Sequence, residues 1–320
     1  MNFSWFTGAR LECDRVNHIG ASDWLIIESG PNPSTDYYVK PAITRRDSSY
    51  QVWDTNSNEP PLVALGTNVV IVRYLAHHAG VWLRTNKRRL GSIVYFMDDE
   101  LINSEAWVGL PTSYKKKLAL NLCSLKRYLP GLVTNYWVAN QRLAASNPYI
   151  NATVVLPVPF DLQTYPTMKN FEANPKLVFY HATSSHIREF IWLKSIIGPV
   201  LEKNRDVFFE TIGDHSINKL YRSLPRTRIL HPMSWQNYIE HSRTLSGAIG
   251  LAPLLEEPFN SYRSHVKYFD ICRARSIGIY SKGSPYAHLV EHANTGWIVR
   301  NSHDEWITQI ENLLTRNMLA

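Results

Sequence analysis

The sequence predicts an α/β protein with two Rossmann-like domains that face a central cleft. First, apolar runs suited to buried strands alternate with segments of helical periodicity, which is the pattern of parallel βαβ units. Second, this alternation occurs in two consecutive series, and 320 residues exceed what one hydrophobic core usually serves. A stretch rich in Pro, Thr and Asn at 157–175 separates the series, so we expect domains at 1–172 and 173–320 joined by a linker there.

The first series becomes regular only after about residue 61. Before that point, short apolar runs at 24–27 and 50–53 predict strands among long loops. The run at 69–72 is β-branched throughout, as in a strand buried on both faces of a parallel sheet. The remaining predicted elements are a helix that closes at Gly91, strands at 92–97, 136–139 and 153–156, and helices at 112–129 and 141–145.

The second series starts with a strand at 176–180 and a polar loop at 181–186. The helix that follows carries Ile187, Phe190 and Leu201 on one face, and we expect Gly198-Pro199 to kink or end it. Further predicted strands lie at 207–212, 228–230, 248–251, 277–280 and 296–299, and further helices follow from Ser234, over 264–272, at 285–292 and at 302–317.

The composition is that of a soluble globular protein, with 44% hydrophobic and 19% charged residues. No apolar run approaches the ~20 residues that span a bilayer, and the amino end lacks the pattern of a signal peptide. The three cysteines, Cys13, Cys123 and Cys272, are far apart and show no zinc or redox spacing. We therefore expect free thiols in a reducing cytoplasm.

The formal net charge of +7 favours an anionic partner. A phosphorylated small molecule and an anionic membrane surface both fit, whereas no DNA- or RNA-binding motif supports nucleic acid. The segment 114–129 combines Lys115, Lys116 and Lys117 with leucines at helical spacing. It predicts either a basic amphipathic helix on anionic lipid at the inner face of the membrane or a surface helix that packs its leucines on the neighbouring sheet.

Ser264, Lys267 and Asp270 form a polar stripe, because residues three apart lie on one side of a helix. A helix N-terminus and an ammonium group favour phosphate oxygens, and a carboxylate accepts hydrogen bonds from ribose hydroxyls. The stripe therefore suits a nucleotide diphosphate, although a solvated helix face would show the same spacing.

Four motifs resemble the retaining, nucleotide-sugar-dependent glycosyltransferases of the GT-B fold, in particular the group 1 or family 4 enzymes that build bacterial surface polysaccharides. The first is the strand, turn and acidic helix start at 178–190, and the second is the segment 251–270 with its polar stripe. The third runs from Gly283 through Tyr286 to Gly296, and the fourth is Asp98-Asp99-Glu100-Leu101. They occur in the expected order over roughly 69–310, which is more specific than any one of them.

The resemblance implies an amino-terminal acceptor domain and a carboxy-terminal donor domain. Asp98 and Asp99 follow a strand, where open α/β sheets place ligands, and His78 occupies a similar position; capping and structural roles are the alternatives. The implied catalytic residues are Asp99, His186 and Lys267. Donor contacts fall to Thr183, Arg188, Asn260, Ser264, Lys267, Asp270 and Tyr286, and acceptor or sugar contacts to His78, Asp98 and Glu257.

The expected reaction is transfer of a sugar from a nucleotide diphosphate-sugar to a glycan or lipid-linked glycan, with retention. Lys267 and Arg188 would stabilise the departing diphosphate, so neither a metal nor another cofactor is required. The histidines at 77, 78, 186 and 215 form no convincing ligand cluster in the sequence.

Two positions depart from the family. Asp270 stands where glutamate is frequent, and Tyr262 stands where many relatives carry another glutamate, so Glu256 or Glu257 would have to substitute for it. The alternative is a catalytically inactive GT-B-like protein that binds a nucleotide or glycan and acts as an assembly partner.

Overall fold

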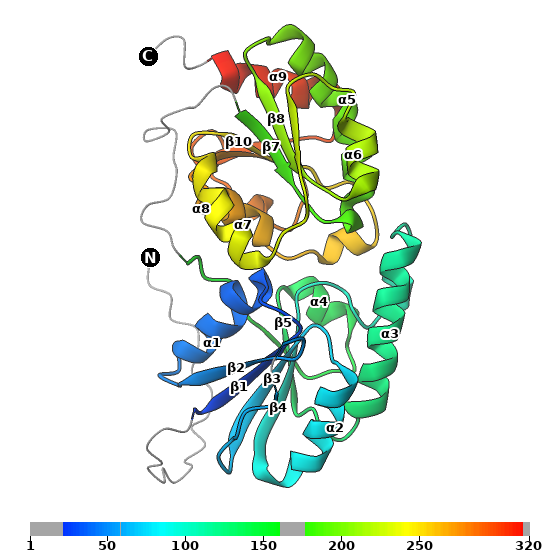
Figure 1. The fold of residues 1–320 in the computed structure, drawn as a ribbon, viewed down its shortest axis with the longest axis vertical. Coiled ribbons are helices and arrows are strands. Elements are labelled where there is room, and N and C mark those ends of the chain that lie inside the picture. The colour runs from blue at the N-terminus through cyan, green and yellow to red at the C-terminus, as the bar shows by residue number, and fades with distance from the viewer. Residues whose placement is uncertain (1–21, 58, 161–176, 316–320) are drawn as a thin grey trace.

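A computed structural model describes residues 22–57, 59–160 and 177–315 and shows two α/β domains stacked along the long axis (Figure 1). Each domain holds one six-stranded sheet in which every pairing is parallel. The prediction of two Rossmann-like domains is therefore confirmed. The predicted boundary at 172/173 and most of the predicted linker lie outside the described residues.

The amino-terminal sheet has the order β2-β1-β3-β4-β5-β6. All five residues of β1 are buried, and β3 buries all but one of its six, so the apolar runs do not alternate with polar residues. The strands are β1 (Trp24–Glu28), β2 (Tyr50–Asp54), β3 (Thr67–Val72), β4 (Leu90–Met97), β5 (Asn135–Val138) and β6 (Ala152–Val154).

Helices flank this sheet: α1 (Lys40–Thr44), α2 (His77–Asn86), α3 (Thr112–Tyr128) and α4 (Gln141–Ser146), with short turns η2 (Lys87–Arg89) and η3 (Ser104–Trp107). In α3, Leu118 and Leu125 are buried and Leu122 is half-buried, so most of the leucine face packs on its own domain. This arrangement agrees with the surface-helix interpretation. No helix in the described ranges is long and apolar enough to cross a bilayer.

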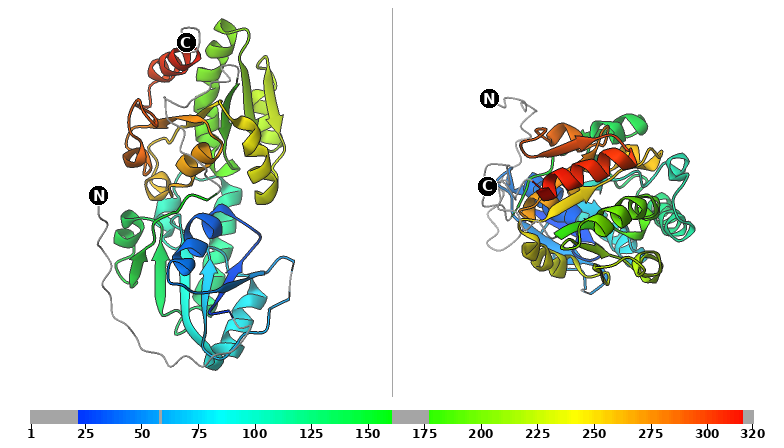
Figure 2. Two further views of the ribbon diagram at one scale, coloured as in Figure 1. Left: turned by 90° about the vertical axis from the view of Figure 1, so that its left-hand side faces the viewer. Right: turned by 90° about the horizontal axis from the view of Figure 1, so that it is seen from above.

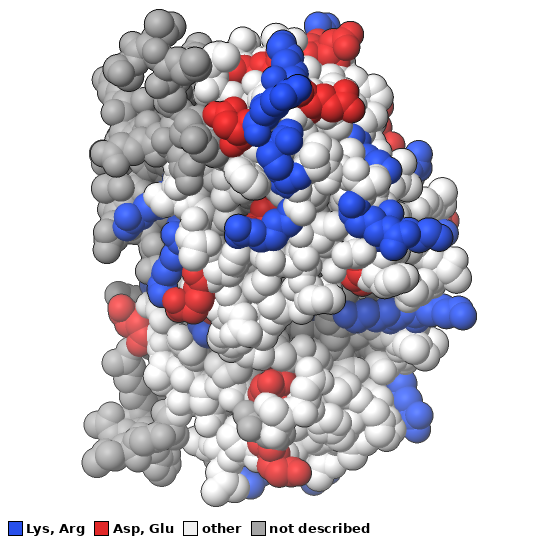
Figure 3. Space-filling model, turned by 45° about the horizontal axis from the view of Figure 1, so that its top comes forward, with Lys and Arg blue, Asp and Glu red and all other residues white. Residues whose placement is uncertain are grey.

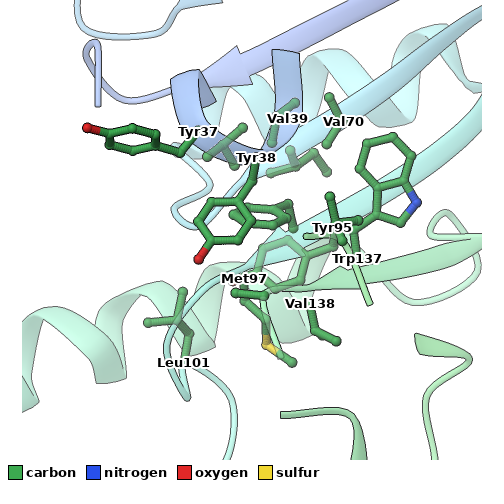
Figure 4. Packing of buried hydrophobic residues seen from close by; sticks show 14 of the residues in the cluster. Tyr37, Tyr38, Val39, Val70, Tyr95, Met97, Leu101, Trp137 and Val138 are labelled. Atoms are coloured by element: carbon green, nitrogen blue, oxygen red, sulfur yellow. The ribbon is translucent and has the colours of Figure 1, made fainter. Parts of the chain in front are cut away.

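The sequence did not predict η1 (Thr35–Val39), a π-helical turn that continues into α1. Tyr37 and Tyr38 leave this turn in different directions, and Tyr38 packs against the sheet core (Figure 4). Both rings are fully buried, yet their hydroxyls reach the second domain: Tyr37 donates to Asp270 Oδ1 at 2.9 Å, and Tyr38 accepts from the His265 amide at 3.0 Å. The η1 turn is thus a structural link between the domains.

The carboxy-terminal sheet has the order β12-β11-β10-β7-β8-β9, the doubly wound arrangement in which the order reverses between the first and fourth strands. Its strands are β7 (Leu177–His181), β8 (Phe208–Ile212), β9 (Thr227–Leu230), β10 (Ile249–Ala252), β11 (Ile277–Ser281) and β12 (Gly296–Val299). The reversal places the loops after β7 and β10 next to each other.

In the described part of this domain, 177–315, the helices are α5 (Ile187–Lys203), α6 (His215–Tyr221), α7 (Trp235–Ser242), α8 (Val266–Arg273) and α9 (His303–Thr315). Helices α5 and α9 lie side by side across one end of the molecule (Figure 2, right). The shorter turns are η4 (Ser184–His186), η5 (Arg243–Leu245), η6 (Phe259–Tyr262) and η7 (Ala287–Leu289).

The structure decides three points that the sequence left open, predicted wrongly or missed in this domain. Helix α5 continues past Pro199 to Lys203, so of the kink or end expected at Gly198-Pro199 the end is excluded. The predicted helix at 285–292 is only the three-residue turn η7, and α6 was not predicted at all. Short elements of this kind are fixed by packing rather than by a sustained periodicity.

Candidate active site

A cavity of about 540 Å³ lies between the two domains and is lined by residues of both. Arg73, Asp98 and Asp99 reach it from the carboxyl ends of β3 and β4. The second domain contributes the loop after β7 and residues of α8. Its position beside the β7/β10 reversal is where open α/β sheets bind their ligands.

The structure brings eight of the sequence-predicted residues to this cavity. They are Asp98, Asp99, Thr183, His186, Ser264, Lys267, Asp270 and Tyr286. Ser264 lies two residues before α8 begins rather than within the helix, so only Lys267 and Asp270 share a helical face. Tyr286 is held by the bond from its hydroxyl to the Ala252 carbonyl at 3.0 Å.

Four predicted residues do not line the cavity. Asn260 donates from Nδ2 to Glu189 Oε1 at 2.7 Å and to the Leu255 carbonyl at 3.0 Å. Its side-chain NH2 group therefore stabilises the loop between β10 and α8. Arg188 and Glu257 form an ion pair with each other outside the cavity lining. His78 is exposed and packs edge-on against Trp53, with ring centres 5.8 Å apart.

Arg263 and Arg73 line this cavity, and sequence reasoning missed both arginines. The Nη1 of Arg263 lies 3.2 Å from Asp99 Oδ2, its Nη2 donates to Ser185 Oγ at 3.1 Å, and its guanidinium lies 4.6 Å from the centre of the Phe259 ring. Burial would lower the pKa of Arg263, but Asp99 and other neighbours outweigh it, so this pKa is raised and the charge is retained. The only sequence signal for Arg263 was its place beside Ser264 in the donor-like motif.

Arg73 holds the acidic pair from the other side. Its Nε lies 3.1 Å from Asp98 Oδ1, and its Nη2 lies 3.2 Å from Asp99 Oδ2. Ser34 donates to the second oxygen of Asp98 at 2.5 Å. Arg73 adopts φ 62°, a left-handed conformation that arginine rarely takes and that the surrounding bonds must maintain. Burial raises the pKa of Asp98, although Arg73 opposes this effect.

Lys267 is half-buried and donates from Nζ to the carbonyl of His181, the last residue of β7. Burial lowers the pKa of Lys267 to about 8, and Asp270 partly opposes this effect. The ammonium group is thus still mostly charged at neutral pH.

His186 and Glu189 lie at the start of α5. Burial lowers the pKa of His186 to about 4, so its imidazole is neutral at pH 7 and can donate or accept a hydrogen bond. Burial would raise the pKa of Glu189, but the nearby His186, whose Nδ1 lies 3.6 Å from Oε2, and the hydrogen bond from the Leu255 amide lower this pKa to about 2. Glu189 therefore anchors the loop from Leu255 to Asn260, because its Oε1 accepts hydrogen bonds from the Leu255 amide and from Asn260 Nδ2.

Asp270 uses one carboxylate oxygen for two contacts inside the protein. Its Oδ1 accepts from the Tyr37 hydroxyl at 2.9 Å and lies 3.5 Å from Arg273 Nη2. Burial raises the pKa of Asp270, and Arg273 opposes this effect. Both contacts with described residues involve Oδ1, so Oδ2 is the oxygen that a ligand in the cavity could use.

A histidine–carboxylate cluster of His181, Glu210 and His241 adjoins the cavity, which His181 also lines. Neither histidine was among those considered as ligands from the sequence. One oxygen of Glu210 lies 3.2 Å from His181 Nε2 and 2.7 Å from His241 Nε2. These residue types could hold a divalent metal ion. However, Arg228 Nη1 lies 3.1 Å from the other oxygen of Glu210, and Lys267 is bound to His181, so two cations already accompany the cluster.

No protein-family model matches the sequence. No curated protein matches it either. Among solved structures, the chain is similar to TarM, with 10% identity and a TM-score of 0.50 over 79% of this chain and 48% of TarM. This match shows that the chain has the GT-B fold. A UDP-GlcNAc 2-epimerase from Methanocaldococcus jannaschii, in complex with UDP-GlcNAc and UDP, has 12% identity and a TM-score of 0.47 over 91% of this chain and 92% of that one. The chain spans about half the length of TarM.

Proposed function

We propose that the protein is a glycosyltransferase that moves a sugar from a nucleotide diphosphate-sugar to a glycan or lipid-linked glycan acceptor. The observation that carries this proposal is the interdomain cavity, in which Lys267 and Arg263 of one domain face Asp98 and Asp99 of the other. Cations on one side suit a diphosphate, and carboxylates on the other suit sugar hydroxyls. The GT-B fold supports the same assignment.

In this proposal the diphosphate lies against Lys267, Arg263 and the loop that precedes α5. The Lys267 ammonium would exchange its bond to the His181 carbonyl for phosphate oxygens, and Arg263 would turn from Ser185 to the ligand. Both cations then stabilise the charge that develops on the departing phosphate. His186, neutral and beside the same loop, would donate a hydrogen bond to the donor, and Asp270 Oδ2 would accept one from the ribose.

The transfer step breaks the bond between the anomeric carbon and the phosphate oxygen and forms a bond to an acceptor hydroxyl oxygen. Asp99, which lies between Arg73 and Arg263, would orient that hydroxyl. The hydroxyl proton ends on the departing diphosphate, so no further proton acceptor is needed. Retention of configuration and independence from metal ions are part of this proposal and rest on the resemblance and on the two cations.

The test is transfer of radiolabelled sugar from UDP- and GDP-sugars to glycan fractions, with nucleotide diphosphate binding measured by calorimetry on the same preparation. We expect binding in the micromolar range and transfer that Lys267→Ala abolishes. Lys194→Ala, on α5 and outside the cavity lining, is the matched control. Normal transfer by Lys267→Ala would overturn the donor-site assignment.

A catalytically inactive nucleotide- or glycan-binding protein is the second candidate. Two observations favour it: Tyr262 does not line the cavity, and Asp98 and Asp99 are both paired with arginines. Neither Glu256 nor Glu257 reaches the cavity to replace a missing carboxylate. Tight nucleotide binding without any donor hydrolysis or transfer would support this candidate and exclude the enzyme.

Contact with an anionic membrane surface would depend on the polar side of α3. Lys116 and Lys117 are exposed there, as is Leu120 at 72%, whereas the buried leucines are committed to the fold. Basic side chains are also visible along the right-hand edge of the face in Figure 3. Cosedimentation with anionic but not neutral vesicles, lost in a Lys116→Glu/Lys117→Glu variant, would establish this contact.

A further inference from the structure

A second cavity, of about 560 Å³, lies in the amino-terminal domain at the carboxyl ends of β1 and β3. Ser29 and Asn32 follow β1, Arg73 follows β3, and Lys117 and Asn121 reach it from α3. Arg73 lines this cavity and the interdomain cavity as well. The two cavities therefore meet at the arginine that also holds Asp98 and Asp99.

The charged groups that line the second cavity are all basic. Arg73 and Lys117 are cations, and no Asp or Glu of the described residues lines the cavity. Lys117 has no carboxylate partner in the described part of the chain; its Nζ lies 4.2 Å from the centre of the Tyr74 ring. Its charge is therefore available to a ligand.

Polar neutral groups complete the wall. His77 Nδ1 is bonded to the Tyr128 hydroxyl at 2.5 Å, which fixes the ring and leaves Nε2 for another partner. Two hydrogen bonds of 3.0 Å hold the Asn121 side chain in place: Oδ1 accepts from the Leu75 amide, and Nδ2 donates to the Arg73 carbonyl. The remaining polar lining side chains are those of Ser29, Asn32, Asn56, Tyr74 and Ser124. The Asn32 amide is committed to Glu28, Gly30 and Thr35, so the others are the groups that suit the hydroxyls of a sugar or polyol.

Two acidic side chains, Glu28 and Asp54, bond to lining residues of the cavity and already accept hydrogen bonds within the protein. Glu28 accepts from Thr35 at 2.5 Å and from Asn32 at 2.9 Å, and burial raises the pKa of Glu28 to about 7. Asp54 accepts from the amides of Gly30 and Asn56 at 2.8 and 2.9 Å. Neither carboxyl lines the cavity. Arg73 is already paired with Asp98 and Asp99, so the uncompensated positive charge that the cavity presents to a ligand is that of Lys117.

We infer that the second cavity binds an anionic group of the acceptor, a phosphate or a carboxylate on a polyhydroxylated molecule, and that Lys117 and His77 hold it. This inference rests on the proposed transferase function and names the substrate class of the second site. The acceptor would extend past Arg73, so that its reactive hydroxyl meets the donor sugar beside Asp99. A protein acting on a nucleotide sugar alone would have no use for this second site.

The test is a ligand-observed NMR titration of the full chain with glucose 6-phosphate, glucuronate and glucose, in the absence and presence of saturating UDP. We expect both anions to bind at least tenfold more tightly than glucose, with UDP present as well as absent. Lys117→Gln should weaken anion binding at least tenfold and leave UDP binding unchanged. Lys126→Gln, exposed on the same helix but outside the cavity, should leave both unchanged.

Three results would overturn the inference: equal affinity for glucose and the two anions, an unaltered affinity in Lys117→Gln, or displacement of the anions by UDP. Displacement would mean that the anions occupy the interdomain cavity. If the chain binds the anions but not UDP, the donor-site proposal is refuted and the anion site in the second cavity is retained. The two proposals can therefore fail separately. Thermal melting of each variant checks that the fold is retained.

Discussion

Arg263 Nη1, from the carboxy-terminal domain, lies 3.2 Å from Asp99 Oδ2, from the amino-terminal domain. Both side chains are buried and both line the interdomain cavity. A buried arginine–carboxylate pair has to offset a large desolvation cost, and such pairs are therefore sensitive to the removal of either partner. The pair joins the proposed donor and acceptor sides of the site. We expect substitution of Arg263 to weaken UDP binding and substitution of Asp99 to strengthen it.

Replacing Arg263 by glutamine should weaken UDP binding by about 10- to 100-fold, because one of the two cations proposed for the diphosphate is lost (about 1.4–2.7 kcal/mol). Arg263→Lys should lie between this variant and the wild type, since an ammonium keeps the charge but not the planar fork. Calorimetry with UDP measures the effect, and Arg222→Gln, exposed on the surface, is the control. Unchanged UDP affinity in Arg263→Gln would remove this arginine from the donor site.

Replacing Asp99 by asparagine should strengthen UDP binding several-fold while it abolishes sugar transfer. The substitution removes the anion that competes with the diphosphate for Arg263, and it also removes the group proposed to orient the acceptor. Binding and transfer assays on the same preparation separate the two effects. If binding weakens, Asp99 is needed to position Arg263 and does not compete with the ligand.

UDP affinity should fall as the pH rises above about 8. Burial lowers the pKa of Lys267 to about 8, so the free protein loses this cation above that value, whereas the protonated form is the one that binds phosphate. The limiting decrease is about tenfold per pH unit, measured above pH 7.5, where the terminal phosphate of UDP is already ionised. Lys267→Arg, which stays charged, should flatten the profile, and an unchanged decline in that variant would contradict the assignment.

The free energy of unfolding should decrease when the pH is lowered from about 6.5 to 4. Burial lowers the pKa of His181, His186 and His265 to about 4, so the unfolded chain takes up protons in this range that the folded chain does not. Each histidine contributes a slope of up to about 1.4 kcal/mol per pH unit. Urea denaturation at pH 7, 6 and 5 measures the decrease, and His265→Gln should reduce the slope.

Two helix glycines should respond oppositely to alanine. A Cβ at Gly80 in α2 would collide with the ring of Tyr128 in α3, so Gly80→Ala should destabilise the fold by about 1–3 kcal/mol. At Gly198 in α5 the nearest atom, Leu224 Cδ2, is 3.8 Å away, so Gly198→Ala should stabilise by about 0.5–1 kcal/mol. Urea denaturation of both variants provides the comparison. Equal changes in the free energy of unfolding would mean that α2 and α3 can move apart at little cost to accommodate the added methyl group.

The strands could be predicted from the sequence because parallel strands buried on both faces appear as uninterrupted apolar runs, as at Val69 to Val72. The carboxyl ends of parallel strands lie at one edge of each sheet, and the two domains were expected to face a central cleft. This is why Asp98 and Asp99 of the first sheet and the loop after β7 of the second were expected at the same site. Their shared cavity is now visible, whereas their catalytic and binding roles stay predictions.

The remaining features depend on contacts between distant residues. Arg263 lies in a loop without periodicity, and its importance follows from Asp99, which is 164 positions away. Asn260 belongs to the same motif, yet its amide is consumed by Glu189. The η1 turn lies between Pro33 and Pro41, so its local sequence favoured a loop. Its buried tyrosines link the domains only through hydrogen bonds with Asp270 and His265, which no local pattern predicts.

The apolar cluster around the first sheet continues without a break into the second domain, where it includes Trp235, Phe269 and Tyr286. Each domain thus relies on its neighbour to keep part of its interior dry. We expect both halves to melt in one calorimetric transition, at a temperature that a bound nucleotide raises for the whole chain. A fragment cut at the linker would present this shared surface to water and aggregate, so the halves cannot be studied as independent modules.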